Sequence, residues 1–189
     1  MKPLEISELK NIADYEVERE TWRPAVMALK DRRRIRVGEH LTFLFENRET
    51  VRYQIQEMMR IERIVKTADI RHELATYNEL IPGPNELSAS LLIEFETPEE
   101  RQVRLAELLG LEDHIWLEVG GQRSKALFDA RQIATDRVSS VQYIKFALSP
   151  HQVERWKDGA RIVVDHPKYR AERALTPQEA AELAADLLS

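Results

Sequence analysis

The sequence contains no cysteine among its 189 residues. This absence excludes disulfides, thiolate metal sites, iron–sulfur ligation by the chain and cysteine nucleophiles. No apolar run approaches the ~20 residues that a membrane-spanning helix needs. The first residues, MKPLE, do not begin an apolar stretch of the signal-peptide kind. We therefore expect a cytoplasmic protein without a membrane span.

Motifs for phosphate binding and for nucleophilic catalysis are missing as well. Gly120-Gly121 lacks the further glycines or the Lys-Ser/Thr ending of a phosphate loop, so a hairpin turn is the better interpretation. No Gly-x-Ser-x-Gly elbow is present. Asp165-His166 precedes a proline and offers a histidine as a base, although an exposed turn histidine is the simpler interpretation. The net charge of −5 argues against a dedicated DNA-binding protein.

The composition is that of a folded protein, with 43% hydrophobic and 32% charged residues. Three segments share a hydroxyl residue, then proline, then Glu or Gln at the third helical position, which is the pattern of a capped helix start. We predict helices that begin near residues 98, 150 and 177. Gly110 and Gly159 are placed to end the first two of them.

Runs rich in β-branched and aromatic residues, bounded by turn residues, predict strands. They cover residues 87–95, 115–119, 138–148 and 162–165. The run 138–148 is apolar on both faces, which favours a central position. Strands joined by short loops, with helices between them, predict an α+β fold in which a largely antiparallel sheet packs with helices. The length fits a single domain over residues 1–189.

The N-terminal third begins with a predicted helix over Asp14–Asp31, in which Pro24 should cause a kink or a restart. A hairpin over residues 33–45 follows. A two-residue turn would mix apolar and polar faces, whereas a three-residue loop, Gly38-Glu39-His40, pairs Val37 with Leu41 and Ile35 with Phe43. Because a buried face fixes the register, we expect the three-residue loop.

A long helix is predicted over residues 48–66, with Asn47 as its N-cap. At 100° per residue, Arg52, Gln56, Arg60 and Arg63 face solvent, whereas Gln54 and Glu62 fall inside the apolar arc. A carboxylate there needs a partner, or its pKa rises. Glu62 therefore either pairs with an arginine or, with Gln54, faces a pocket or a metal. The apolar arc itself consists of Val51, Ile55, Met58, Ile61 and Val65.

The sequence also resembles a known family along nearly its whole length. The blocks that carry the resemblance are Phe45–Thr50, Gln54–Ile64, Tyr77–Pro82, Leu87–Glu94 and Ser140–Ile144. They closely resemble the bacterial domain-of-unknown-function family 3501. The family supplies no established activity or catalytic residue. Its members are often encoded near rubrerythrin-like and iron–sulfur proteins, so the resemblance implies partners of that redox or peroxide-defence kind.

Two further clusters are candidate sites. The five histidines lack the three- or four-residue spacing of helical metal ligands, so a metal site would have to be assembled across elements, from Glu57, Glu62, His72 and Glu94. The basic cluster Arg32–Arg36 places Arg34 and Arg36 on one face of the hairpin. These arginines either form salt bridges with Glu39, Glu46 and Glu49, or hold a small anion, or bind nucleic acid.

We expect a non-catalytic accessory or interaction protein that works with rubrerythrin-like or iron–sulfur partners. The alternative is a small-anion or metal-binding enzyme with its site in Glu46–Glu62, where Arg48 anchors the ligand, Glu62 acts as acid–base group or ligand, and Gln54 orients. A second alternative is a nucleic-acid-binding regulator that uses Arg32–Arg36. The sequence does not identify a cofactor. A homodimer is the assembly that base rates favour.

Overall fold

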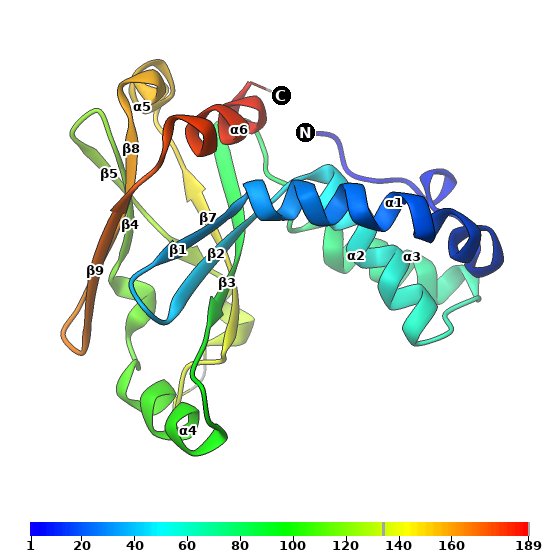
Figure 1. The fold of residues 1–189 in the computed structure, drawn as a ribbon, viewed down its shortest axis with the longest axis horizontal. Coiled ribbons are helices and arrows are strands. Elements are labelled where there is room, and N and C mark those ends of the chain that lie inside the picture. The colour runs from blue at the N-terminus through cyan, green and yellow to red at the C-terminus, as the bar shows by residue number, and fades with distance from the viewer. Residues whose placement is uncertain (134, 189) are drawn as a thin grey trace.

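A computed structural model describes residues 1–133 and 135–188 of the chain. Within these residues the strands pair only in the antiparallel sense, so the predicted α+β class is confirmed. The strands divide between two sheets that pack face to face, whereas one sheet packed with helices was expected (Figure 1). No helix in the described ranges is long and apolar enough to cross a membrane.

The five-stranded sheet has the order β1-β2-β3-β7-β6 and the four-stranded sheet the order β5-β4-β8-β9. The first consists of β1 (Arg34–Val37), β2 (Leu41–Glu46), β3 (Glu86–Ile93), β7 (Val141–Ala147) and β6 (Leu127–Phe128). The second consists of β5 (Gln122–Lys125), β4 (Ile115–Val119), β8 (Ala160–His166) and β9 (Tyr169–Ala174). The four runs predicted as strands thus become β3, β4, β7 and β8. The middle strand is β3, and β7 lies between β3 and the two-residue β6.

The main core lies between the two sheets. Alternate residues of each strand point inward, so Phe43 and Phe45 of β2 and Ile162 and Val164 of β8 are buried in one hydrophobic cluster. The hydrogen-bonded register pairs Ile35 with Phe43 and Val37 with Leu41. The predicted three-residue hairpin loop is therefore confirmed.

Tyr169 joins the two sheets at this hairpin. Its hydroxyl donates to the main-chain oxygen of Val37 (2.9 Å) and accepts from the amide of His40 (3.1 Å). Gly38 has a positive φ of 69°, and a Cβ at this position would overlap the Tyr169 hydroxyl. Both the backbone conformation and the close approach therefore require glycine in the turn.

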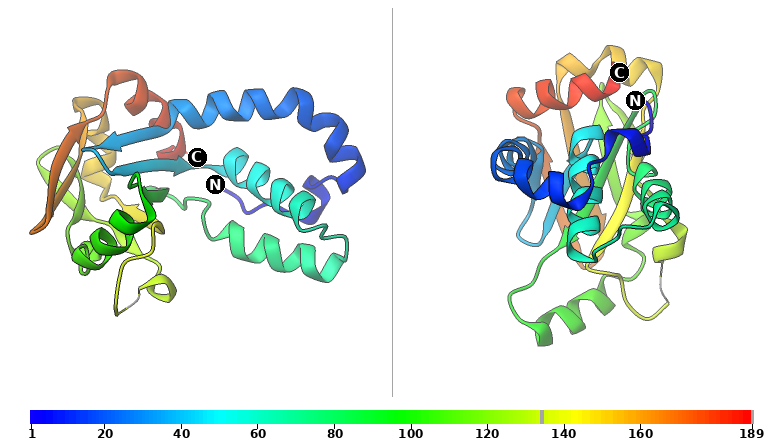
Figure 2. Two further views of the ribbon diagram at one scale, coloured as in Figure 1. Left: turned by 60° about the horizontal axis from the view of Figure 1, so that its bottom comes forward. Right: turned by 90° about the vertical axis from the view of Figure 1, so that its right-hand side faces the viewer.

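Three helices form a helical arm that extends from the outer side of the five-stranded sheet (Figures 1 and 2): α1 (Ile12–Arg32), α2 (Arg48–Ile61) and α3 (Thr67–Asn78). A second hydrophobic cluster, which includes Val51, Ile55 and Leu74, holds the arm together. Helix α1 continues through Pro24 as one element, so the predicted restart did not occur. Helix α3 was not predicted, and its N-cap Lys66 provides no side-chain hydrogen bond that would mark its start.

The remaining helices are α4 (Pro98–Glu107), α5 (Pro150–Glu154) and α6 (Pro177–Leu187), and their predicted starts are confirmed. Thr97, Ser149 and Thr176 each accept a hydrogen bond from the amide three residues later. Helix α4 ends before Gly110, which adopts a left-handed φ of 87° at the start of a short 3-10 turn. Local capping chemistry therefore explains where these helices begin.

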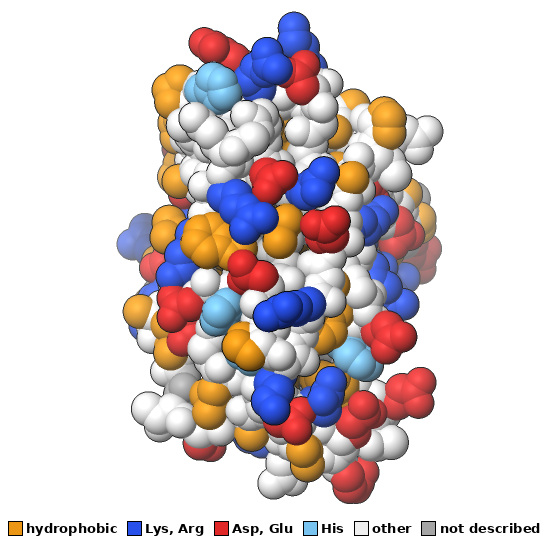
Figure 3. Space-filling view, turned by 90° about the vertical axis from the view of Figure 1, so that its left-hand side faces the viewer, with side chains coloured by type: hydrophobic (Ala, Val, Ile, Leu, Met, Phe, Trp, Pro, Cys, Tyr) orange, Lys and Arg blue, Asp and Glu red, His pale blue; other side chains and the backbone are white. Residues whose placement is uncertain are grey.

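The outer face of the four-stranded sheet carries interleaved charges of both signs (Figure 3). Glu118 of β4 lies between Arg123 at 3.0 Å and Arg161 at 3.7 Å, and Arg161 also reaches Glu172 at 3.6 Å. Arg123 and Arg161 thus each face a carboxylate, and charges that alternate in sign do not favour binding of a phosphate backbone.

Candidate functional site

The helical arm approaches the outer face of the five-stranded sheet, and polar side chains lie on this face. Phe43 and Phe45 point into the core, so the alternating Leu44 and Glu46 point to this outer face. The strand register aligns Glu46 of β2, Ser88 of β3 and Lys145 of β7 in one row. Leu44, Ser90 and Tyr143 form the next row.

Glu46 is the buried acid of this face, with only 7% of its surface exposed. Its carboxylate accepts hydrogen bonds from the Ser90 hydroxyl (2.7 Å) and from the Thr50 hydroxyl in the first turn of α2. No basic side chain in the described part of the chain forms an ion pair with this carboxylate. A buried acid is thus held by neutral donors alone.

A cavity of about 210 Å³, here called the arm cavity, lies between this face and the helical arm. Burial raises the pKa of Tyr77, and the charges of Glu73 and Glu62 act in the same direction, while a hydrogen bond with Gln54 opposes them. Burial likewise raises the pKa of Tyr143, together with the nearby Tyr77 and Glu46. Both phenols therefore stay protonated near neutral pH. The polar side chains that line the arm cavity are Lys30, Glu46, Gln54, Tyr77, Ser90 and Tyr143.

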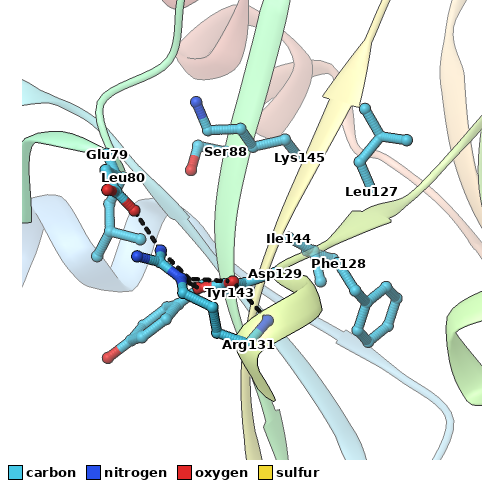
Figure 4. Close-up of a pocket in the computed structure, with 10 residues that line it drawn as sticks. All are labelled: Glu79, Leu80, Ser88, Leu127, Phe128, Asp129, Arg131, Tyr143, Ile144 and Lys145. Atoms are coloured by element: carbon cyan, nitrogen blue, oxygen red, sulfur yellow. Dashed lines mark hydrogen bonds and ion pairs between the residues drawn. The ribbon is translucent and has the colours of Figure 1, made fainter. Parts of the chain in front are cut away.

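Figure 4 shows a second cavity of about 370 Å³, here called the sheet cavity. It adjoins the arm cavity, because Leu80 and Tyr143 line both. Arg131 crosses its rim, bound to Asp129 and Glu79. Lys145 extends over the sheet to Glu86 at 2.7 Å.

Ser88 is the unusual residue of the sheet cavity. The side chain is 1% exposed, and its hydroxyl has no hydrogen-bond partner among the described residues. Buried polar groups nearly always have a partner, and leaving one unpaired costs roughly 1–3 kcal/mol. Buried polar groups that can form further hydrogen bonds therefore line both cavities.

The prediction that Glu62 lies on the buried face of a helix over residues 48–66 is wrong. Helix α2 ends at Ile61, Glu62 is its exposed C-cap, and Arg63 adopts a left-handed φ of 54°. Beyond this point the 100° spacing no longer applies, and Val65 is 71% exposed. Ile61, the last residue of α2, is 63% exposed. Gln54 does line the arm cavity, whereas Glu62 is exposed at the end of the helix.

The prediction that Gln56 faces solvent is also wrong, because this residue is buried. It is 2% exposed and binds both main-chain groups of Lys10, at 2.7 Å and 3.2 Å. The segment before α1 covers this face of α2, which the helical period alone could not show.

Arg48 does not face either cavity. It binds the Glu8 carboxylate and donates to the main-chain oxygen of Lys2 at 3.1 Å. The basic cluster is engaged with carboxylates too: Arg34 pairs with Asp31 at 3.0 Å and Arg36 lies 4.0 Å from Glu94.

Arg32 and Arg33 also pair with carboxylates, which belong to helix α6. Arg32 pairs with Glu182 at 3.1 Å, and the 1% exposed Arg33 binds Asp186 and Glu182. Salt bridging is therefore the interpretation that the geometry supports. Of the predicted carboxylates, Glu49 lies 4.0 Å from Arg52 at the start of α2. Glu39 and Glu46 form no ion pair with an arginine among the described residues, and Glu39 lies 3.8 Å from His40.

The three acids and one histidine proposed as metal ligands do not come together, and no group of three or more such side chains suited to a metal occurs in residues 1–133 and 135–188. His72 and Glu62 are exposed, and Glu94 accepts from Thr42 at 2.6 Å. Glu57 is enclosed by Arg19 (2.7 Å) and the Tyr15 hydroxyl (2.7 Å).

His166 is buried, with 4% of its surface exposed, so its interpretation as an exposed turn histidine is wrong. Its Nδ1 accepts from the Lys168 amide (3.2 Å), and its Nε2 faces the main-chain oxygen of Leu109 (3.0 Å). Both ring nitrogens are thus used within the fold, which leaves none for acid–base chemistry.

Sequence reasoning missed Tyr77, Tyr143 and Lys145 as residues of a site. A signal for the shared face did exist, because Ser88 and Ser90 interrupt an otherwise apolar strand at alternate positions. Two hydroxyls on one face of a buried strand indicate a polar surface beside them.

The comparisons with known proteins match this chain along almost all of its length. Residues 3–187 match the model of a family described as "Protein of unknown function (DUF3501)". A crystal structure of a "novel protein of unknown function" from Burkholderia pseudomallei K96243 is similar, with 34% sequence identity and a TM-score of 0.92. The match covers 98% of this chain and 100% of that one. No curated protein matches the chain.

Proposed function

Because the chain belongs to the DUF3501 family, whose description carries no activity, we propose a function from its own geometry: it binds a small polar molecule in the adjoining arm and sheet cavities. The observation that carries the proposal is the unpaired, buried hydroxyl of Ser88 at the sheet cavity. A ligand that hydrogen-bonds this hydroxyl removes the cost of leaving it unpaired. Concave sites with a few convergent polar groups are where proteins bind small molecules.

Blocking the sheet cavity tests this proposal. Leu127 lies at the cavity and is 55% exposed, so Leu127→Trp can fill the space without disturbing the core. Val103→Trp is the matched control, because Val103 lies on α4 outside both cavities and is 59% exposed. We expect fractions of a cell metabolite extract to raise the melting temperature of the wild type and of Val103→Trp but not of Leu127→Trp. The proposal fails if no fraction shifts the wild type, or if the Leu127→Trp protein shifts equally.

Ser88→Ala separates binding from stability. Removing an unpaired buried hydroxyl should leave the free energy of unfolding unchanged or raise it by about 1 kcal/mol. The same change should reduce the melting-temperature shift caused by an active fraction. A residue that served only packing would lower the stability and leave the shift intact.

An accessory role with rubrerythrin-like or iron–sulfur partners is our second proposal. Exposed aliphatic side chains at the free end of the helical arm favour it, because a partner could cover them: Val17, Ile61 and Val65 are 79%, 63% and 71% exposed. They belong to one region, since Arg60 pairs with Glu16 at 3.6 Å. Co-purification with such proteins, lost in an Ile61→Glu, Val65→Glu variant, is the expected result; recovery of neither partner with the wild type would contradict it.

A further inference from the structure

We propose that the arm cavity binds an organic ammonium group, with the Glu46 carboxylate as its counter-ion and the rings of Tyr77 and Tyr143 as its walls. This inference rests on the proposed small-molecule function and names the class of ligand. It is argued from the charge, the walls and the size of the cavity.

The charge argument concerns Glu46. A buried carboxylate is costly unless it is paired and hydrogen-bonded, and Glu46 has two hydroxyl donors but no ion-pair partner in the described residues. An ionised carboxylate offers about four acceptor positions, so capacity remains for a cationic donor. Arg33 does not supply it, because its guanidinium donates to the main-chain oxygens of Phe45 and Glu46 and pairs with Asp186 and Glu182.

The walls suit a cation as well. Tyr77 and Tyr143 are half-buried and line the same cavity as Glu46. The negative face of an aromatic ring attracts an ammonium group, and the attraction is stronger where water is excluded. The Gln54 amide oxygen and the tyrosine hydroxyls are further acceptors for the N–H groups of such a ligand.

The surrounding charges disfavour an anion. The carboxylates of Glu73 and Glu62 act on Tyr77. Glu79 and Asp129 of the adjoining sheet cavity are paired with Arg131 and so leave no strong positive field there. Lys30 is the cation that lines the arm cavity, and its ammonium lies 5.3 Å from the centre of the Tyr53 ring. Lys30 is therefore an internal competitor for the ligand, and its removal should strengthen binding.

The size of the arm cavity sets the size of the ligand. Its volume of about 210 Å³ exceeds the cavity of about 150 Å³ that accommodates a benzene molecule in another protein. A primary amine with four or five carbon atoms is of the same order. The shared lining residues Leu80 and Tyr143 leave room for a longer chain to continue toward the sheet cavity.

Calorimetric titration with three probes of similar shape tests the inference: n-butylammonium, neutral 1-pentanol and the pentanoate anion. We expect n-butylammonium to bind at least about tenfold more tightly than either of the others, because only it can pair with Glu46. Equal affinity for 1-pentanol, or a preference for pentanoate, would overturn the assignment.

Variants locate the binding group. Glu46→Gln keeps one acceptor oxygen for either Ser90 or Thr50, and its amide N–H can donate to the other hydroxyl. It should therefore fold and lose the preference for the amine over 1-pentanol. Lys30→Met should raise the affinity for n-butylammonium. Tyr143→Phe should retain binding and Tyr143→Leu should weaken it, because only the first keeps the ring. Unchanged amine affinity in Glu46→Gln contradicts the inference even if every other variant behaves as expected.

The two proposals fail in distinguishable ways. If metabolite fractions shift the wild type but not Leu127→Trp, and the amine probe does not bind, the cavities bind a ligand of another class and only this inference falls. If no fraction produces a shift and the amine does not bind, the proposed function falls with it.

Discussion

At the scale of single residues, the contacts of Glu57 on α2 determine how the helical arm is held. Its carboxylate accepts hydrogen bonds from Arg19 (2.7 and 3.0 Å) and from the Tyr15 hydroxyl (2.7 Å), and Arg60 lies 3.4 Å away. Burial alone would raise the pKa of Glu57, but the hydrogen bonds from Arg19 and Tyr15 outweigh it and lower the pKa to about 2. The folded protein therefore favours the ionised carboxylate.

This lowered pKa predicts a dependence of stability on acid. The unfolded chain releases the proton of Glu57 near pH 4.5, so its contribution to stability is complete above that pH and is lost as the pH falls toward 2. We expect Glu57→Gln to lower the free energy of unfolding by roughly 3 kcal/mol at neutral pH. In urea titrations, the difference in free energy of unfolding between Glu57→Gln and the wild type should become smaller as the pH falls below 4.5.

Glu16→Gln is the control for this titration. Glu16 is 50% exposed and 3.6 Å from Arg60, and exposed pairs contribute about 0–1 kcal/mol. If the difference in free energy of unfolding between Glu57→Gln and the wild type stays constant from pH 6 to pH 3, the fold does not stabilise the ionised form of Glu57.

At the scale of elements, a buried ion pair fastens helix α6 to the start of the five-stranded sheet. Arg33, between α1 and β1, binds Asp186 and Glu182 of α6 and donates to the main-chain oxygen of Phe45 at 2.8 Å. Burial raises the pKa of Asp186, and the charge and hydrogen bond of Arg33 oppose that change. Neither group can lose its partner without leaving a charge in the interior.

Arg33→Ala is therefore expected to lower the free energy of unfolding by about 3–5 kcal/mol. Arg32→Ala should change it by less than about 1 kcal/mol, because Arg32 is 58% exposed although it contacts the same Glu182. Hydrogen exchange should show faster exchange of the α6 amides in the Arg33→Ala protein. If both variants lose a similar amount of free energy of unfolding, burial of the Arg33–Asp186 pair does not contribute to stability.

At the scale of the whole molecule, the helical arm and the sheet sandwich have separate hydrophobic clusters. The chain crosses between them repeatedly, from α1 into β1, from β2 into α2 and from α3 into β3. Tyr143 of the sheet packs against the cluster of the arm. These links favour joint folding, in agreement with the predicted single domain.

We therefore expect one cooperative unfolding transition. In a Trp22→Phe protein, the remaining Trp116 and Trp156 report on the sheet sandwich, while circular dichroism at 222 nm reports mainly on the helices of the arm. The two signals should give the same urea midpoint. Two separate midpoints would show that arm and sandwich unfold as independent domains.

Local chemistry allowed much of this fold to be predicted. The helix starts after Thr97, Ser149 and Thr176 depend on hydrogen bonds that span three residues, and the hairpin register depends on apolar side chains within ten positions of each other. Such features need no knowledge of the rest of the chain. The family resemblance was equally open to sequence reading, because contiguous blocks carry it.

The candidate site was decided by tertiary structure. Glu46, Ser88 and Lys145 meet because three strands distant in the sequence pair in one register, and the pairing of distant strands is not encoded in any single segment. The exposure of Glu62 depends on where α2 stops, and the left-handed turn at Arg63 ends the period on which its burial was predicted. Sequence by itself determined the helix starts and the hairpin of this protein, because they depend on interactions between residues close in the chain. Only the packing of the arm on the sheet determined which polar side chains share a cavity.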